Sequence, residues 1–102
     1  MTKMMVRYKV KPEHVAENER DIERVFEQLV AQRPTGVRYA SFKLADGVSF
    51  IHIVSHEAVD DRNPLSELQA FRAFTAAVER RCEERPVVTN LTEVGSYHVF
   101  GD

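Results

Sequence analysis

The strongest candidate for chemistry in this sequence is a histidine in the middle of the chain. His52 stands between Phe50 and Val54 in an apolar run, which predicts a strand. An imidazole titrates near neutral pH, so His52 is a candidate general base or hydrogen-bonding group toward a ligand. The alternative is a half-buried histidine that serves only as a structural hydrogen-bond partner, for example of Ser41.

A β-hairpin is predicted to position His52. Two strands, residues 37–45 and 48–56, flank Asp46-Gly47, a strong hairpin signal because both turn residues adopt positive φ. A two-residue turn pairs Ser41 with His52. The opposite face is almost wholly apolar and is predicted to lie beneath helices as core; it carries Ala40, Phe42, Leu44, Ile51 and Ile53.

The other elements complete the order βαββαβ. Residues 4–11 alternate as a strand, and a helical stripe runs from Val15 to the stop at residues 33–36. Asn63-Pro64 opens a second helix, residues 65–84, which Arg85-Pro86 ends. Residues 87–100 are β-rich, with a bulge or bend at Gly95. This order predicts one α+β domain, residues 1–102, of the ferredoxin-like kind: a four-stranded antiparallel sheet with both helices on one face.

The second face of such a sheet lacks a helical cover. If Val6, Tyr8 and Val10 join the core, then Arg7 and Lys9 face outward; a bulge in the first strand would invert this assignment. The mixture of apolar and polar residues suits a two-fold homodimer, sheet face to sheet face, that encloses a pocket for a small organic molecule. The alternative is an interface without ligand. The predicted outer face carries Arg7, Lys9, Tyr39, Ser41, Lys43, Phe50, His52, Val54 and His56.

Composition argues against several other functions. The formal net charge is -2 and no long basic run occurs, which disfavours nucleic acid. A single cysteine and the lack of a long apolar segment predict a cytoplasmic protein without a membrane span. His52 and His56 lie about 13 Å apart along a strand, so no shared metal site is expected. Cys82 lies near three arginines, but its place on the helical stripe indicates core rather than a reactive thiol.

The sequence resembles the antibiotic biosynthesis monooxygenase family. The resemblance rests on the order of elements, the Tyr-Lys-Val-Lys-Pro end of the first strand (Tyr8 to Pro12), the hairpin and the phenylalanine-led third strand, and it covers nearly the whole chain. It implies a dimeric α/β barrel. The best-understood members use an Asn on the first strand, a Trp ending the third strand and a His on the second helix. Here the first strand lacks Asn, the chain has no Trp, with His56 or its neighbour at that position, and the second helix lacks His.

Two functions are therefore predicted. The first is a cofactor-independent, monooxygenase-like enzyme acting on a small aromatic or polyketide-type molecule. His52 would accept the proton, and the substrate would contact Arg7, Tyr39, Ser41, Phe50, Val54 and His56. The second is a non-catalytic homodimer that binds or sequesters a small molecule.

Overall fold

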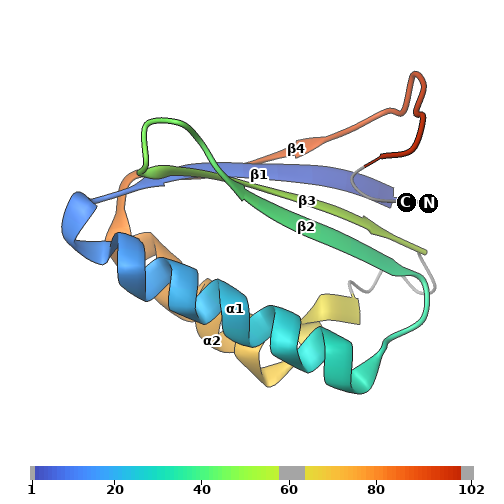
Figure 1. The fold of residues 1–102 in the computed structure, drawn as a ribbon, viewed down its shortest axis with the longest axis horizontal. Coiled ribbons are helices and arrows are strands. Elements are labelled where there is room, and N and C mark those ends of the chain that lie inside the picture. Colours follow the sequence, from blue (N-terminus) through green and yellow to red (C-terminus); the bar gives the residue numbers. More distant parts are fainter. Residues whose placement is uncertain (1, 58–63, 100–102) are drawn as a thin grey trace.

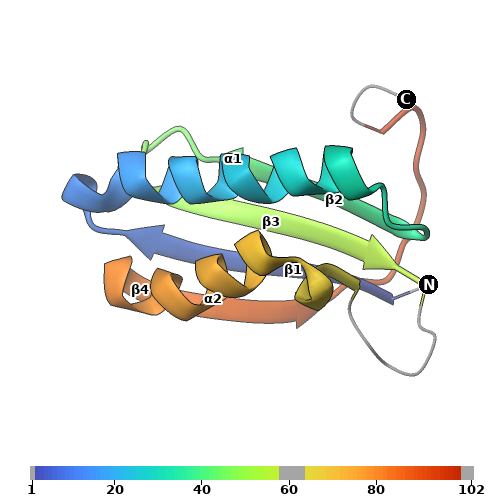
Figure 2. The same ribbon diagram turned by 90° about the horizontal axis from the view of Figure 1, so that it is seen from below.

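The structure, a computed structural model, describes residues 2–57 and 64–99 of the chain. Its elements in chain order are β1 (Thr2–Val10), α1 (Val15–Gln32), β2 (Val37–Lys43), β3 (Ser49–His56), α2 (Gln69–Arg81) and β4 (Cys82–Asn90), with short 3-10 helices at Pro12–His14 and Pro64–Glu67. The strands form an antiparallel sheet in the order β2-β3-β1-β4. Both helices cover one face and leave the other open (Figure 1, Figure 2). The predicted ferredoxin-like α+β fold is confirmed.

Helix α1 forms because its apolar residues recur at helical spacing. Val15, Ile22, Val25 and Leu29 pack against the core, and the opposite face is charged. Arg33 caps the C-terminal end of the helix: it adopts the left-handed conformation with φ 46° and donates its backbone N–H to the Leu29 carbonyl. This ending agrees with the predicted stop and turns the chain toward β2.

The register of the hairpin is confirmed. Ser41 pairs with His52 in the β2–β3 ladder, as a two-residue turn requires. The turn itself differs from the prediction: Gly47 has φ +77°, but Asp46 does not have positive φ. Instead, the Asp46 carboxylate accepts hydrogen bonds from the backbone N–H groups of Val48 and Ser49 and from the Ser49 hydroxyl, and so holds the loop.

The predicted faces of the hairpin are reversed. Tyr8 pairs with Phe50, and Val6 pairs with His52, so these residues share one face of the sheet. That face lies beneath the helices, where Tyr8 and Phe50 are each 2% exposed. The predicted core residues of the hairpin therefore belong to the open face: Ala40, Phe42, Ile51 and Ile53 alternate with the buried set.

The reversal has a physical cause. The prediction placed the more apolar face of the hairpin toward the helices. The other face is buried instead, and it carries aromatic rings and hydroxyl groups that contact one another. Polar groups can be buried when they find partners, and the Tyr39, Ser41 and His52 side chains of this face do so. The completed core cluster consists of Tyr8, Val10, Val25, Phe50, Val54, Leu65, Leu68, Phe74 and Val78.

The last third of the chain also departs from the prediction. Helix α2 ends at Arg81 rather than at residue 84, and β4 begins at Cys82 and includes Pro86. A proline is tolerated there because β4 is an edge strand of the sheet. Gly95 lies beyond β4, so the predicted bulge does not interrupt this strand. The predicted N-cap Asn63 lies outside the described residues.

Candidate functional site

A buried hydrogen-bonded cluster is centred on His52. The side chain is 3% exposed and lies between the sheet and the helices. Its Nε2 atom lies 2.7 Å from the Tyr8 hydroxyl. Its Nδ1 atom lies 2.7 Å from both the Tyr39 hydroxyl and Ser41 Oγ. Both ring nitrogens of His52 therefore have hydroxyl partners supplied by the two neighbouring strands.

Aromatic rings enclose this imidazole. The ring centroids of Tyr8, Tyr39 and Phe74 lie 5.3, 5.8 and 5.4 Å from that of His52. Burial lowers the pKa of His52 to about 4, so the ring is neutral at physiological pH. Burial also raises the pKa of Tyr8, and raises that of Tyr39 to about 12 against the opposing hydrogen bond of Ser41. All these groups are uncharged at neutral pH.

The cluster is anchored on its inner side by a buried arginine. Asn18 of α1 is fully buried, and its amide nitrogen donates to the Tyr8 hydroxyl at 2.9 Å. Arg81, 1% exposed at the end of α2, donates to Asn18 Oδ1 at 3.2 Å. Arg81 also pairs with Asp21, and with Glu17 at 3.4 Å, so its buried charge is compensated. Helices α1 and α2 are thus joined at this point.

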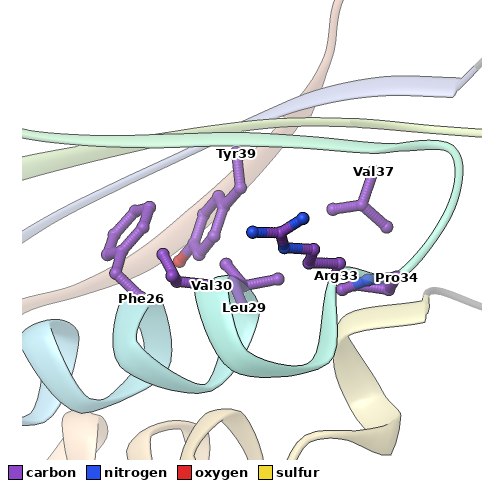
Figure 3. A pocket seen from close by; sticks show the side chains of 7 residues that line it. All are labelled: Phe26, Leu29, Val30, Arg33, Pro34, Val37 and Tyr39. Carbon is purple, nitrogen blue, oxygen red and sulfur yellow. The ribbon is translucent and has the colours of Figure 1, made fainter.

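The outer side of the cluster opens on a groove between α1 and the edge strand β2. A pocket of about 280 Å³ is lined by Tyr39 together with Phe26, Leu29, Val30, Arg33, Pro34 and Val37 (Figure 3). A second hollow, of about 200 Å³, lies along the same groove and is lined by Ser41, Phe50, Glu19, Ile22, Glu23, Phe42 and Lys43. Stacking of Phe26 on Tyr39, with ring centroids 5.1 Å apart, forms the wall of the larger pocket on its inner side.

Figure 3 shows how the pocket combines apolar and polar groups. The Tyr39 ring extends from β2 toward α1, and the Arg33 guanidinium extends over the pocket between Tyr39 and Val37. Aliphatic side chains form the remaining wall. An apolar lining with one hydroxyl and one cation suits a small planar molecule that carries a polar oxygen.

The structure separates the residues that were predicted to form one site. Six of the seven lie on the helix-covered side: Tyr39, Ser41, Phe50, His52, Val54 and His56. Arg7 lies on the open face of the sheet and cannot share a site with them. The prediction that His52 points into a space between two sheets is wrong, because its ring packs beneath the helices.

Four of the seven predicted site residues line neither pocket: Arg7, His52, Val54 and His56. Val54 and His56 are 5% and 4% exposed, and neither borders the groove. Cys82, predicted to end the helical stripe, instead begins β4 and donates its thiol to the Val78 carbonyl. Burial raises the pKa of the Cys82 thiol, which opposes activation. No group of three metal-ligating side chains occurs within residues 2–57 and 64–99.

Sequence reasoning missed Asn18, Arg81 and Arg33. A signal for the first two was present, since Asn18 lies on the apolar stripe between Val15 and Ile22, and Arg81 follows Phe74 and Val78 at helical spacing. A polar residue on an apolar stripe indicates a buried hydrogen-bonded group. Arg33 carried no comparable signal, because it stands in the polar segment that ends the helix.

Comparison with known structures places the fold among the antibiotic biosynthesis monooxygenase-like proteins. The protein Rv0793 of Mycobacterium tuberculosis superposes with a TM-score of 0.74 at 14% identity, over 93% of this chain and 96% of that one. A solved antibiotic biosynthesis monooxygenase superposes with a TM-score of 0.70 at 19% identity, over 93% and 100%. A variant of SnoaB of Streptomyces nogalater, a cofactor-independent oxygenase, gives 0.68 at 18% identity, over 93% and 94%.

No family model matches the sequence, and no curated protein matches it significantly. The structural likeness therefore establishes the class of fold: a monooxygenase-like ferredoxin fold. Within the part of the chain that the structure describes, neither helix is both long and apolar enough to cross a bilayer.

Proposed function

We propose that this protein is a monooxygenase-like enzyme that binds a small, planar, electron-rich aromatic molecule in the α1–β2 groove. The observation that carries the proposal is the position of Tyr39, which lines the larger pocket and whose hydroxyl lies 2.7 Å from the buried His52. A volume of about 280 Å³ is at the lower limit of ligand pockets, which favours a molecule of one or two rings. No bound cofactor is part of this proposal.

Tyr39 and Arg33 would have complementary roles in this pocket. A phenolic or enolic oxygen of the substrate would accept a hydrogen bond from Tyr39 and face the Arg33 guanidinium. Both contacts stabilise a substrate that has lost its phenolic or enolic proton to water, and this electron-rich anion is the form that reacts with dioxygen. His52 would act through Tyr39 as a positioning residue, because it is buried and does not itself line the pocket.

The assembly proposed for this function is a homodimer through the open face of the sheet. Ile53 lies between Met5 and Ala40 on this face, and Ile51 lies between Arg7 and Phe42. An apolar sheet face of this extent favours a protein interface over solvent. The reversed hairpin makes this face more apolar than the sequence had predicted, which supports the same two-fold contact of sheet against sheet.

A second function is supported by one observation. Both ring nitrogens of His52 already have partners, and the pocket lining contains no carboxylate or imidazole that could remove a proton. This arrangement also suits a protein that binds a small molecule without transforming it.

Tyr39→Phe and Arg33→Gln test the pocket against the two functions. Binding of two-ring phenols such as naphthols and naphthalenediols would be measured by fluorescence, and oxygen uptake by electrode, with Arg38→Gln as the control on the outer side of β2. An enzyme should show uptake that both pocket variants reduce about tenfold or more, since each removes a group aimed at the oxyanion. Binding without uptake would select the second function. Equal binding by the wild type and both pocket variants would show that the pocket is elsewhere.

A further inference from the structure

The direction of the hydrogen bonds through the buried cluster can be derived from the chemistry of its members. Arginine has no acceptor, so the Asn18 atom that faces Arg81 must be the amide oxygen. The Asn18 amide nitrogen consequently faces Tyr8 and donates to its hydroxyl oxygen. Arg81 thus sets the orientation of the Asn18 amide.

The hydroxyl hydrogen of Tyr8 then has one acceptor. Within the described part of the chain, Tyr8 Oη has two side-chain partners, Asn18 Nδ2 and His52 Nε2. The first is a donor, so Tyr8 donates to Nε2. If Nε2 carried the ring hydrogen instead, the buried Tyr8 hydrogen would lack an acceptor, which is unfavourable for a buried hydroxyl. His52 is therefore held as the tautomer with hydrogen on Nδ1.

The hydrogen bonds keep the same donor-to-acceptor direction from His52 to the groove. Nδ1–H donates toward the hydroxyl oxygens of Tyr39 and Ser41, each 2.7 Å away. Because His52 Nδ1 is the donor in its contact with Tyr39, it does not take up the hydroxyl hydrogen of Tyr39, which stays available to the pocket that this residue lines.

We infer that Asn18 and Arg81 are positioning residues that set a one-way hydrogen-bond relay through Tyr8 and His52, so that Tyr39 meets the ligand as a donor. The relay selects ligands that offer an acceptor, a carbonyl or phenolate oxygen, over ligands that offer only N–H or O–H. The relay concerns the ligand-free protein, whereas the ligand class rests on the proposed function of the α1–β2 pocket.

Asn18→Asp should reverse the relay. The new carboxylate accepts from Arg81 on one oxygen and from the Tyr8 hydroxyl on the other. Tyr8 can then only accept from His52, which moves the ring hydrogen to Nε2. Nδ1 becomes an acceptor for Tyr39, and the pocket loses its donor. Gln28→Glu is the matched control, because Gln28 lies on the same helix and its side-chain oxygen accepts from the Ala70 backbone outside the relay.

Nitrogen-15 NMR of selectively labelled histidine rings reads the tautomer directly. His52 is identified as the ring whose signals are absent from the His52→Gln variant. The wild type and Gln28→Glu should show a protonated Nδ1 and a bare Nε2, and Asn18→Asp should show the reverse. A wild-type ring protonated on Nε2 would overturn the relay, even if Asn18→Asp fails to fold. Unchanged protonation in a folded Asn18→Asp variant would do so as well.

The ligand class is tested with two probes of similar size, chromone as an acceptor and indole as a donor. The ratio of their dissociation constants should favour chromone in the wild type and in Gln28→Glu, and should shift toward indole by about three- to tenfold in Asn18→Asp. An unchanged ratio together with a reversed tautomer would refute the selection of acceptors. If neither probe binds, the proposed function fails and the ligand class with it, while the NMR result still decides the relay.

Discussion

At the scale of single residues, the molecule places a neutral imidazole where the sequence suggested an accessible base. His52 is enclosed by three aromatic rings and bonded at both nitrogens. An imidazole in this position contributes hydrogen bonds and orientation, and in the proposed function contact with the ligand passes to Tyr39. The proposed relay acts in series through Asn18, Tyr8 and His52.

The buried histidine makes stability dependent on pH. The pKa of His52 is lowered from 6.5 to about 4 in the folded state, so the unfolded chain takes up the proton first as the pH falls. The contribution of His52 to the free energy of unfolding should be constant above pH 6.5 and decrease between pH 6.5 and 4, by up to roughly 3 kcal/mol. Urea denaturation at pH 7, 6 and 5 measures this decrease.

His52→Gln provides the comparison for that measurement. The variant should be less stable at pH 7, because the Gln amide cannot reproduce the hydrogen bonds of both His52 ring nitrogens. Its free energy of unfolding should not show the decrease between pH 6.5 and 4 that His52 causes. The lowered pKa of Asp46, about 2, affects stability only below its ordinary value of 3.8 and does not overlap this range. An identical pH profile in the wild type and His52→Gln would show that His52 titrates normally.

At the scale of elements, the β2–β3 loop determines which residues face one another across the hairpin. The Gly47 amide donates to the Leu44 carbonyl, and the Asp46 carboxylate accepts from the two residues that lead into β3. These bonds start the ladder that pairs Ser41 with His52. The exposed turn thus sets the strand register on which the geometry of the buried cluster depends.

Gly47→Val should destabilise the protein by about 1 kcal/mol or more. Gly47 has φ +77°, which a β-branched residue adopts only with strain, although no atom lies within 4 Å of the added Cβ. Gly95→Val is the matched control, because Gly95 also has open space but no positive φ. Thermal melting compares the two variants. Equal melting temperatures would show that the loop does not need the left-handed conformation.

At the scale of the whole molecule, helices cover one face of the sheet, and the other face lies open in the part of the chain that the structure describes (Figure 1, Figure 2). The open face carries Met5, Ala40, Phe42, Ile51 and Ile53, and Phe42 is 38% exposed. The groove and the His52 cluster lie on the opposite side, so the proposed association and the proposed ligand binding would use separate surfaces.

Ile53→Lys should convert the proposed dimer to a monomer that remains folded. The charge would be placed in the centre of the open face, where it cannot be solvated within an interface. Light scattering gives the mass, and circular dichroism checks the fold. Val30→Lys is the control, since Val30 is 71% exposed on α1, away from the sheet face. A monomeric wild type at micromolar concentration would contradict the dimer.

The sequence by itself determined the order of elements, the antiparallel sheet and the pairing of Ser41 with His52, because periodicity and turn residues act over short distances. It also singled out His52, Tyr39 and Ser41 as residues with chemical potential. It did not determine which face of the hairpin lies inside, since period two gives two faces and both carry apolar residues.

Only the tertiary structure decided that choice. Burial of the polar face depends on partners far away in the chain: Tyr8 from β1, Asn18 from α1 and Arg81 from α2 each satisfy a group that would otherwise be costly to bury. The end of α2 was decided in the same way, because β4 pairs with β1 from Cys82 onward and so ends the helix before Pro86. Helical spacing marks Asn18 and Arg81 as buried, but contacts between residues distant in sequence leave no periodic signal, so the buried cluster and its groove became visible only in the folded chain.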